Sequence, residues 1–222
     1  QSDQVFVLWS DIVEEKNRDK AMAALLTALE NKNWHLSTGL FGTKMLFDLL
    51  RKENLTEVAY KIANQRSFPG WGHMIESGAT TLWETWRYSD NIYSQNHPML
   101  GSIGAWFYRS ILGINELEPG FRKILIKPQP AGDLTYAEGS FKTLYGEIVS
   151  SWKISEGKFF LRTNIPVNNT ATVVIPSPFK KNIKVDGETA PFHDGIISYE
   201  EKDDHIVFET GSGEYHFEVS PY

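Results

Sequence analysis

The 222-residue sequence contains no cysteine, so disulfides, thiolate zinc sites and a cysteine nucleophile are excluded. It also lacks a basic run of five residues, and its net charge is -6, which argues against a nucleic-acid platform. No stretch approaches the roughly 20 apolar residues that a membrane-spanning helix needs. No charged and then apolar leader opens the chain, so we expect any signal peptide to lie outside these residues.

What is present is the composition of a folded protein, with 41% hydrophobic and 13% aromatic residues. Such a length can bury one large core or two ordinary ones. Six of the seven tryptophans lie at or before Trp106, and only Trp152 lies beyond it. Because the composition changes near residue 118, we expect a helical domain over 1–117 and a strand-rich domain over 118–222.

Apolar spacing and strong helix formers predict helices in the first part. They cover residues 5–9, 20–29, 43–50, 56–63, 79–86 and 98–111. About six helices joined by short loops fit a small bundle or one half of a helical toroid. In the second part, short runs bounded by turn residues predict strands. They cover residues 123–127, 141–152 with a turn at Gly146, 158–162, 170–175, 183–185, 196–199, 205–209 and 214–219. Many short strands without intervening helices predict an antiparallel β-sandwich.

The densest segment, residues 68–86, holds three tryptophans, three glycines and the carboxylates Glu76 and Glu84. Tryptophan faces commonly bind sugar rings through apolar C–H surface. A pair of carboxylates is the usual agent of glycosidic bond chemistry. A single Trp-Glu-x-Trp is more often part of a core helix with one solvated carboxylate than part of a catalytic site. The sequence has no helical zinc motif, G-x-S-x-G, phosphate loop or dinucleotide fingerprint, so we expect no metal and no cofactor.

Four segments in order resemble the bacterial α-L-rhamnosidases of glycoside hydrolase family 78. They are residues 33–43 (NWHLSTGLFGT), 68–75 (FPGWGHMI), 78–86 (GATTLWETW) and 95–97 (QNH). The segments 119–128 and 211–217 are similar to the C-terminal β-domain of that family. The resemblance therefore extends over nearly the whole chain, and four ordered motifs are more specific than any one of them.

The resemblance implies the last part of an (α/α)6 toroid over 1–117, followed by a β-sandwich over 118–222. It implies an inverting hydrolase for terminal α-L-rhamnosyl residues, with Glu84 as the general base and His97 as a contact to the sugar. Trp71, Trp83 and Trp86 would be walls or supports of the pocket, and His35 would face it. The ligand implied is a rhamnose-containing oligosaccharide or glycoside, and neither nucleic acid nor a membrane is expected as a partner. The resemblance favours a periplasmic or secreted protein over a cytoplasmic one.

The acidic segment that carries the general acid of this family has no counterpart in the sequence. We therefore expect the general acid to lie in an N-terminal remainder of the same enzyme, and this fragment alone to be inactive.

Two alternatives stay open. One is another (α/α)6 glycosidase or a phosphorylase, although Arg87 is almost the only cation near Glu84 that could bind phosphate. The other is a carbohydrate-binding or structural module that uses strand aromatics. The candidates are Phe159, Phe160, Tyr199 and Phe217, although alternate apolar positions in strands more often belong to a core.

Overall fold

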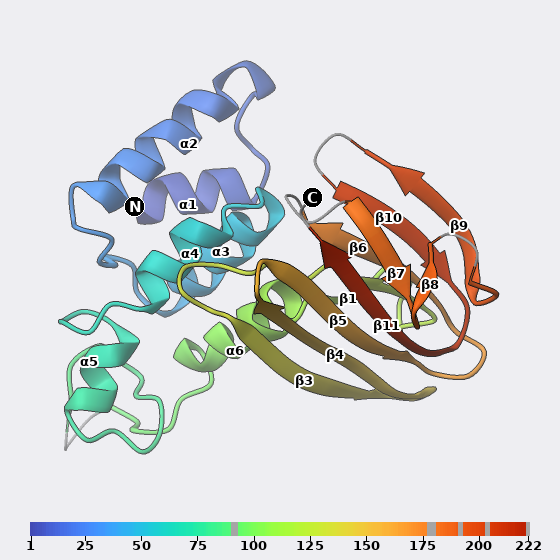
Figure 1. Cartoon of the computed structure of the whole chain (residues 1–222). Helices are drawn as coiled ribbons and strands as arrows, with labels where there is room; N and C mark the ends of the chain where they lie inside the picture. Colours follow the sequence, from blue (N-terminus) through green and yellow to red (C-terminus); the bar gives the residue numbers. More distant parts are fainter. Residues whose placement is uncertain (90–92, 177–180, 191–192, 203–204, 221–222) are drawn as a thin grey trace. The chain divides into compact units, whose positions relative to one another are not determined.

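The computed structural model describes residues 1–89, 93–176, 181–190, 193–202 and 205–220. Its contacts divide the chain into two compact units, Gln1–Trp106 and Phe107–Tyr222. The first unit is helical and the second consists mainly of β-strands (Figure 1). No helix within the described residues is both long and apolar enough to cross a lipid bilayer.

The first unit is built on helices that bury one apolar face each. They are α1 (Ser2–Trp9), α2 (Glu15–Glu30), α3 (Leu40–Lys52), α4 (Thr56–Ala63), α5 (Trp71–Glu76), the 3-10 turn η1 (Leu100–Ser102) and α6 (Ile103–Trp106). The residues that face the interior, such as Leu8, Leu25 and Leu46, are fully buried. Buried residues recur three or four positions apart, as at Val5 and Leu8 in α1 and at Leu25 and Leu29 in α2, so the amphipathic pattern predicts α1 to α4 correctly. The predicted helix over 5–9 is confirmed and starts three residues earlier.

The prediction of a helix over 79–86 is wrong. Gly78 has φ 87°, a left-handed backbone that ends α5, and residues 79–86 are irregular. The backbone groups of Leu82 and Glu84 bond to residues 94–97 instead of to the next helical turn. Long-range pairing has therefore overridden the apolar spacing of this segment. Conversely, α5 was not predicted, because Gly70, Gly72 and Gly78 make its surroundings look like a loop.

The helix predicted over 98–111 is present only from Leu100 and is not uniform. It consists of η1, then α6, then the π-helical turn η2 (Phe107–Ile111), with which the second unit opens. Gly113 follows with φ 74°, and a Cβ there would lie 2.1 Å from the carbonyl carbon of Lys127. Only glycine fits this combination of left-handed backbone and close approach.

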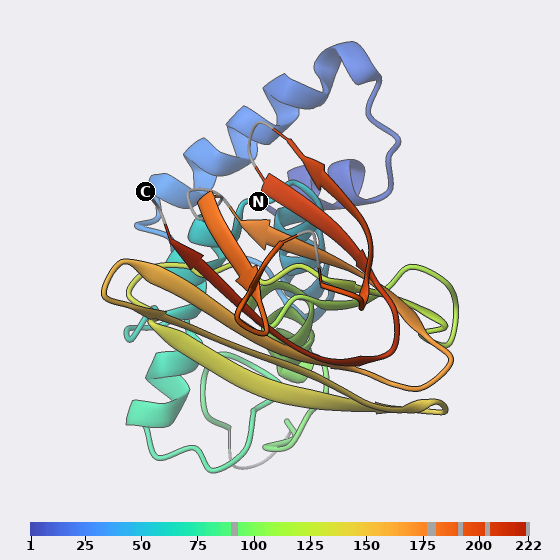
Figure 2. The ribbon, with the colours of Figure 1, turned by 45° about the vertical axis from the view of Figure 1, so that its right-hand side comes forward.

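The second unit contains two sheets. The strands are β1 (Ile114–Glu116), β2 (Lys123–Ile126), β3 (Tyr136–Thr143), β4 (Gly146–Ser155), β5 (Lys158–Ile165), β6 (Thr170–Pro176), β7 (Lys181–Val185), β8 (Glu188–Thr189), β9 (Ile196–Glu201), β10 (His205–Thr210) and β11 (Gly213–Ser220). One sheet has the order β1-β2-β6-β10-β9 and the other the order β3-β4-β5-β11-β7-β8. Figure 2 shows the strands from a second direction. All the strands predicted from the sequence are found, whereas β1, β8 and the first half of β3 were not predicted.

The pairing is antiparallel except between β2 and β6, which run parallel. Burial alternates along β5 and β11, so one face of each strand belongs to the core. Phe208 on β10 and Phe217 on β11 come from different sheets, and their ring centroids lie 5.2 Å apart. The buried faces of both sheets therefore contribute to one apolar core.

Candidate active site

The candidate site begins with the glycine-rich loop before α5. A Cβ at Gly72 would lie 2.6 Å from the carbonyl oxygen of Gln65, and one at Gly70 would lie 2.8 Å from the same oxygen. The N–H of Gly72 donates to that oxygen at 3.2 Å. The glycines of the Pro-Gly-Trp-Gly motif are therefore explained by a close backbone approach, which sets the start of α5 and the position of Trp71.

Two tryptophans of the motif pack against each other. The rings of Trp71 and Trp86 meet edge to face, with centroids 5.0 Å apart. The indole N–H of Trp71 donates to the carbonyl oxygen of Leu100 at 3.1 Å, and that of Trp86 donates to the carbonyl oxygen of Thr38 at 3.1 Å. These contacts tie three of the four resembling segments, 33–43, 68–75 and 78–86, to one another and to Leu100. Since Trp71 is buried and Trp86 is partly exposed, Trp71 supports Trp86 from behind.

Trp83 belongs to a neighbouring part of the same core. It is buried with Met74 and Leu100, and its ring meets that of Tyr88 at a centroid distance of 5.3 Å. Among these three tryptophans, Trp86 is partly exposed, whereas Trp71 and Trp83 are buried. The structure favours a supporting role for Trp71 and Trp83 over direct contact with a ligand.

Backbone hydrogen bonds bring the Trp-Glu-Thr-Trp segment beside the Gln-Asn-His segment. The N–H of His97 donates to the carbonyl oxygen of Leu82 at 2.9 Å, and the N–H of Glu84 donates to the carbonyl oxygen of Ser94 at 2.8 Å. The hydroxyl of Thr81 also donates to the carbonyl oxygen of Gln95. The two segments run antiparallel, so Glu84 and His97, thirteen positions apart in the sequence, belong to one local structure.

The carboxylate of Glu84 is partly exposed and fixed by the main chain. Its Oε2 accepts a hydrogen bond from the N–H of Ser94 at 2.8 Å. The side chain is thus neither sealed in the apolar core nor free to rotate in solvent. One oxygen is occupied by a backbone donor, and the other lone pairs are available to a water molecule.

His97 is also oriented by the main chain. Its Nδ1 accepts a hydrogen bond from the N–H of Met99 at 3.3 Å, which fixes this nitrogen as the acceptor. The neutral ring therefore carries its proton on Nε2, and this N–H is the atom that could bind a hydroxyl oxygen.

His35 bonds to groups outside the Glu84 and His97 segments. Its Nε2 lies 2.8 Å from the hydroxyl of Ser67, and its Nδ1 lies 3.0 Å from the carbonyl oxygens of Lys32 and Asn33. Both ring nitrogens are therefore already paired with the protein. Glu76, the other carboxylate of the dense segment, is exposed and forms an ion pair with Arg66 at 2.6 Å.

Sequence reasoning missed the residues that position these side chains. Ser94 holds Glu84, and Thr38 holds Trp86 while its buried hydroxyl bonds to that of Thr43 at 2.8 Å. Thr38 lies inside a resembling segment, but Ser94 directly precedes one. Since both act through main-chain atoms, no side-chain motif could have identified them. Within the described residues, no group of three or more His, Asp or Glu side chains is arranged to hold a metal ion.

Comparison with known protein families now adds to this geometry. Residues 1–111 match the bacterial α-L-rhamnosidase six-hairpin glycosidase domain, and residues 113–190 match the bacterial α-L-rhamnosidase C-terminal domain. The chain belongs to the bacterial α-L-rhamnosidase family.

Individual relatives agree with this membership. An α-L-rhamnosidase of Streptomyces avermitilis is 36% identical over 99% of the chain, and one of Formosa agariphila is 34% identical over 99%. The chain spans only 21% and 25% of the lengths of these two curated relatives. It therefore corresponds to about a quarter or less of each of these rhamnosidases.

Solved structures of the family have the same fold. The α-L-rhamnosidase from Dictyoglumus thermophilum superposes with a TM-score of 0.89 at 38% identity, over 98% of this chain and 25% of that one. The Streptomyces avermitilis enzyme in complex with L-rhamnose superposes with a TM-score of 0.89 at 34% identity, over 99% of this chain and 21% of that one. The enzyme from Aspergillus terreus superposes with a TM-score of 0.78 at 27% identity, over 97% of this chain and 23% of that one.

Proposed function

We propose that this chain is the C-terminal part of an inverting α-L-rhamnosidase that removes terminal α-L-rhamnosyl residues from glycans or glycosides. In this proposal, the helical first unit (Gln1–Trp106) completes an (α/α)6 toroid whose earlier helices lie in the preceding part of the enzyme. The second unit (Phe107–Tyr222) forms its C-terminal β-sandwich. The observation that carries the proposal is Glu84, held by the Ser94 N–H beside His97 and Trp86 in a chain of this family.

Glu84 is the general base of the proposed reaction. Its free carboxylate oxygen accepts a proton from a water molecule while the water oxygen forms a bond to the anomeric carbon. The bond from that carbon to the leaving oxygen breaks on the opposite face. A general acid outside this chain protonates the leaving oxygen. Inversion requires the two carboxyl groups to lie about 6.5–9.5 Å apart, which leaves room for the water.

The other side chains orient the sugar. The Nε2–H of His97 donates to a rhamnose hydroxyl, because its Nδ1 is engaged by Met99. The partly exposed Trp86 packs against the apolar side of the sugar ring, and Trp71 and Trp83 hold Trp86 in place. His35, which is bonded to Ser67, is proposed as a further wall of the pocket.

The proposal is tested by rhamnose release from p-nitrophenyl α-L-rhamnoside. The 222-residue chain alone is expected to release none. A longer polypeptide, in which the missing part of the toroid precedes this chain, is expected to release rhamnose, with the β-anomer formed first in ¹H NMR spectra. In that polypeptide, Glu84→Gln is expected to lower kcat by about 10²–10⁴-fold, as for loss of a general base.

Glu76→Gln is the matched control, because Glu76 is exposed and paired with Arg66, and it is expected to leave kcat nearly unchanged. Azide, which needs no base, is expected to restore turnover in Glu84→Ala and to yield the β-rhamnosyl azide. Retention of activity in Glu84→Gln would contradict the assignment of Glu84 as the base. Rhamnose release by the 222-residue chain alone, if it depends on Glu84, would contradict the requirement for an external acid.

A further inference from the structure

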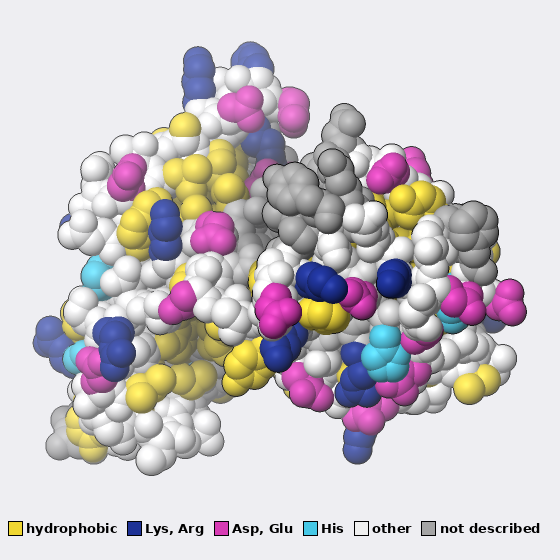
Figure 3. All heavy atoms as spheres, viewed as in Figure 1, with side chains coloured by type: hydrophobic (Ala, Val, Ile, Leu, Met, Phe, Trp, Pro, Cys, Tyr) yellow, Lys and Arg dark blue, Asp and Glu magenta, His cyan; other side chains and the backbone are white. Residues whose placement is uncertain are grey.

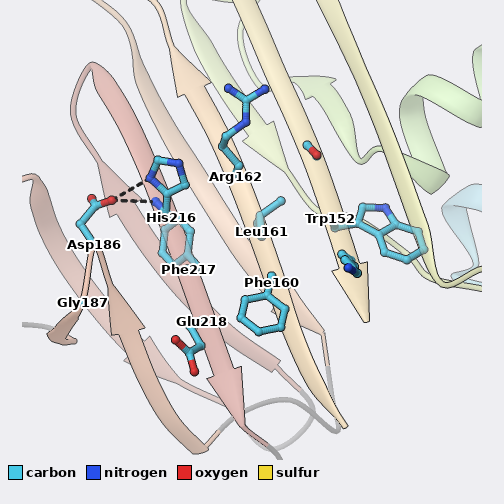
Figure 4. A pocket seen from close by; sticks show the side chains of 11 residues that line it. Trp152, Phe160, Leu161, Arg162, Asp186, Gly187, His216, Phe217 and Glu218 are labelled. Atoms are coloured by element: carbon cyan, nitrogen blue, oxygen red, sulfur yellow. Dashed lines mark hydrogen bonds and ion pairs between the residues drawn. The ribbon is translucent and has the colours of Figure 1, made fainter. Parts of the chain in front are cut away.

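The outer face of the six-stranded sheet carries a groove of about 520 Å³. It lies wholly within the second unit, on strands β4, β5 and β11 and on the turn after β7 (Figure 4). We call it the sheet groove and define it by Ser151, Phe160, Arg162, Asp186, His216 and Glu218. Its volume lies within the range of about 300–1,000 Å³ that is typical of small-molecule sites.

The register of the sheet arranges these side chains in two neighbouring rows. Arg162 pairs with Ser151 on one side and with His216 on the other. Two positions along β5, Phe160 lies between Lys153 and Glu218. Residues that are directly opposite on one face lie about 4.5–5.5 Å apart at their Cβ atoms. A partly exposed aromatic ring is thereby surrounded by hydrogen-bonding side chains.

The buried faces of the same strands hold this arrangement rigid. Trp152, Leu161 and Phe217 alternate with the groove residues, and each is only 1% exposed. Of the four aromatic residues that the sequence suggested for sugar binding, Phe159 and Phe217 are core residues, whereas Phe160 faces the groove. Phe160 therefore provides an aromatic surface on a fixed platform, at little cost in conformational entropy.

Most charged side chains around the groove are paired with one another. Glu218 bonds to Lys158 at 2.7 Å, and Arg162 bonds to Glu214 at 3.1 Å. Asp186 accepts hydrogen bonds from the main-chain N–H of His216 at 3.1 Å and pairs with its Nδ1 at 2.9 Å. Acidic and basic side chains lie interspersed over these strands in the space-filling view (Figure 3). The groove therefore presents no excess of one sign that would select a charged ligand.

Some polar side chains in the sheet groove can still form hydrogen bonds with a ligand. Among the residues that the structure describes, the hydroxyl of Ser151 and the ammonium of Lys153 have no hydrogen-bonding partner. The paired carboxylates of Asp186 and Glu218 keep further lone pairs. An uncharged ligand with one apolar face and many hydroxyls matches such a site.

We propose that the sheet groove binds a neutral oligosaccharide, with one sugar ring stacked on Phe160 and its hydroxyls bonded to Ser151, Lys153 and Asp186. This site shares no residue with the Glu84 site and does not depend on the assignment of Glu84. It would retain the enzyme on a glycan while the hydrolytic site acts on chain ends.

The test is ligand-observed saturation-transfer NMR on the full 222-residue chain. The probes are methyl α-L-rhamnoside, maltotriose and cellotriose, with the acidic digalacturonate for comparison. At least one neutral probe is expected to bind. Phe160→Ala is expected to weaken its Kd about tenfold or more, whereas Phe160→Trp retains binding. Tyr136→Ala is the matched control, since Tyr136 is a 70% exposed aromatic residue on β3 of the same sheet that does not line the groove.

His97→Ala separates this site from the hydrolytic one, and it is expected to leave the binding unchanged. Ser151→Tyr provides a second variant that fills the groove without removing the ring, and it is expected to abolish binding. The proposal is overturned if no neutral probe binds, if only digalacturonate binds, or if binding persists in both Phe160→Ala and Ser151→Tyr. Loss of binding in Tyr136→Ala or His97→Ala, with Phe160→Ala unaffected, would also place the site elsewhere.

Discussion

Glu84 and Ser94 are joined by two hydrogen bonds in opposite directions, each 2.8 Å long. The N–H of Glu84 donates to the carbonyl oxygen of Ser94, and the N–H of Ser94 donates to Oε2 of Glu84. One bond aligns the two chain segments and the other aims the carboxylate. The orientation of the proposed base thus depends on main-chain groups of a loop ten residues away.

Replacing Ser94 tests this positioning in the longer polypeptide that contains the whole toroid. Ser94→Pro removes the N–H and is expected to lower kcat about tenfold or more with little change in KM, since a hydrogen bond to a charged group contributes about 1.5–3 kcal/mol. Ser94→Ala keeps the N–H and should behave nearly as the wild type. Equal kinetic effects of the two variants, or an effect on KM alone, would contradict a positioning role for the Ser94 N–H.

Because of the close approach at Gly72, we expect alanine to destabilise the protein at this position but not at Gly104. Gly72→Ala places a Cβ 2.6 Å from the carbonyl oxygen of Gln65, so we expect a loss of about 1–3 kcal/mol in unfolding free energy, as for other overpacked sites. A Cβ at Gly104, within α6, would meet no atom within 4 Å. Gly104→Ala is therefore expected to raise the unfolding free energy by about 0.5–1 kcal/mol. Urea unfolding of the chain measures both. A neutral Gly72→Ala would mean that the loop shifts freely.

The buried indole of Trp152 is expected to stabilise the second unit through its hydrogen bond. Its indole N–H donates to the carbonyl oxygen of Ile111 at 2.7 Å, and the side chain is buried. Trp152→Phe keeps an aromatic ring but leaves that oxygen unpaired, so we expect a loss of about 1–3 kcal/mol or more in unfolding free energy. Tyr136→Phe, at an exposed position, is expected to change it by less than about 0.5 kcal/mol. Similar midpoints for both variants in thermal unfolding would refute the role of this bond.

The pair of Lys158 and Glu218 predicts a pH dependence. The hydrogen bond from Lys158 lowers the pKa of Glu218 below 4.5, and the bond to Glu218 raises the pKa of Lys158 above 10.5. The contribution of the pair to stability is therefore fully present between about pH 4.5 and 10.5. It is lost as the pH falls through the pKa of folded Glu218 or rises through that of folded Lys158.

Lys158→Met is expected to return the pKa of Glu218 toward its usual value and to make stability fall less steeply below pH 4.5. NMR titration of the Glu218 side-chain carboxyl carbon measures the shift directly. Because both side chains are exposed to solvent, added salt should reduce the difference between the variant and the wild type. An unchanged pKa in Lys158→Met would show that the ion pair is not formed in solution.

Local pattern was sufficient for most of the helices and strands. Residues 56–63 are helical as the spacing of Ala59 and Ile62 indicates, and the strand at 158–162 follows from alternation between Phe159 and Leu161. In both cases the period of the apolar residues matches the face that is buried. The segment 79–86 failed this rule, because its backbone partners lie at residues 94–97 and no local window contains them.

The sequence by itself determined the family, through four ordered motifs, and the identity of the acidic, histidine and tryptophan side chains of the candidate site. Only the tertiary structure decided which segments meet: the chain around Glu84 pairs with the chain before His97, Trp71 packs against Trp86, and His35 bonds to Ser67. It alone separated the core ring of Phe159 from the groove ring of Phe160. The physical reason is that residue types record which chemistry is possible, whereas hydrogen bonds and contacts between distant segments fix where each group points.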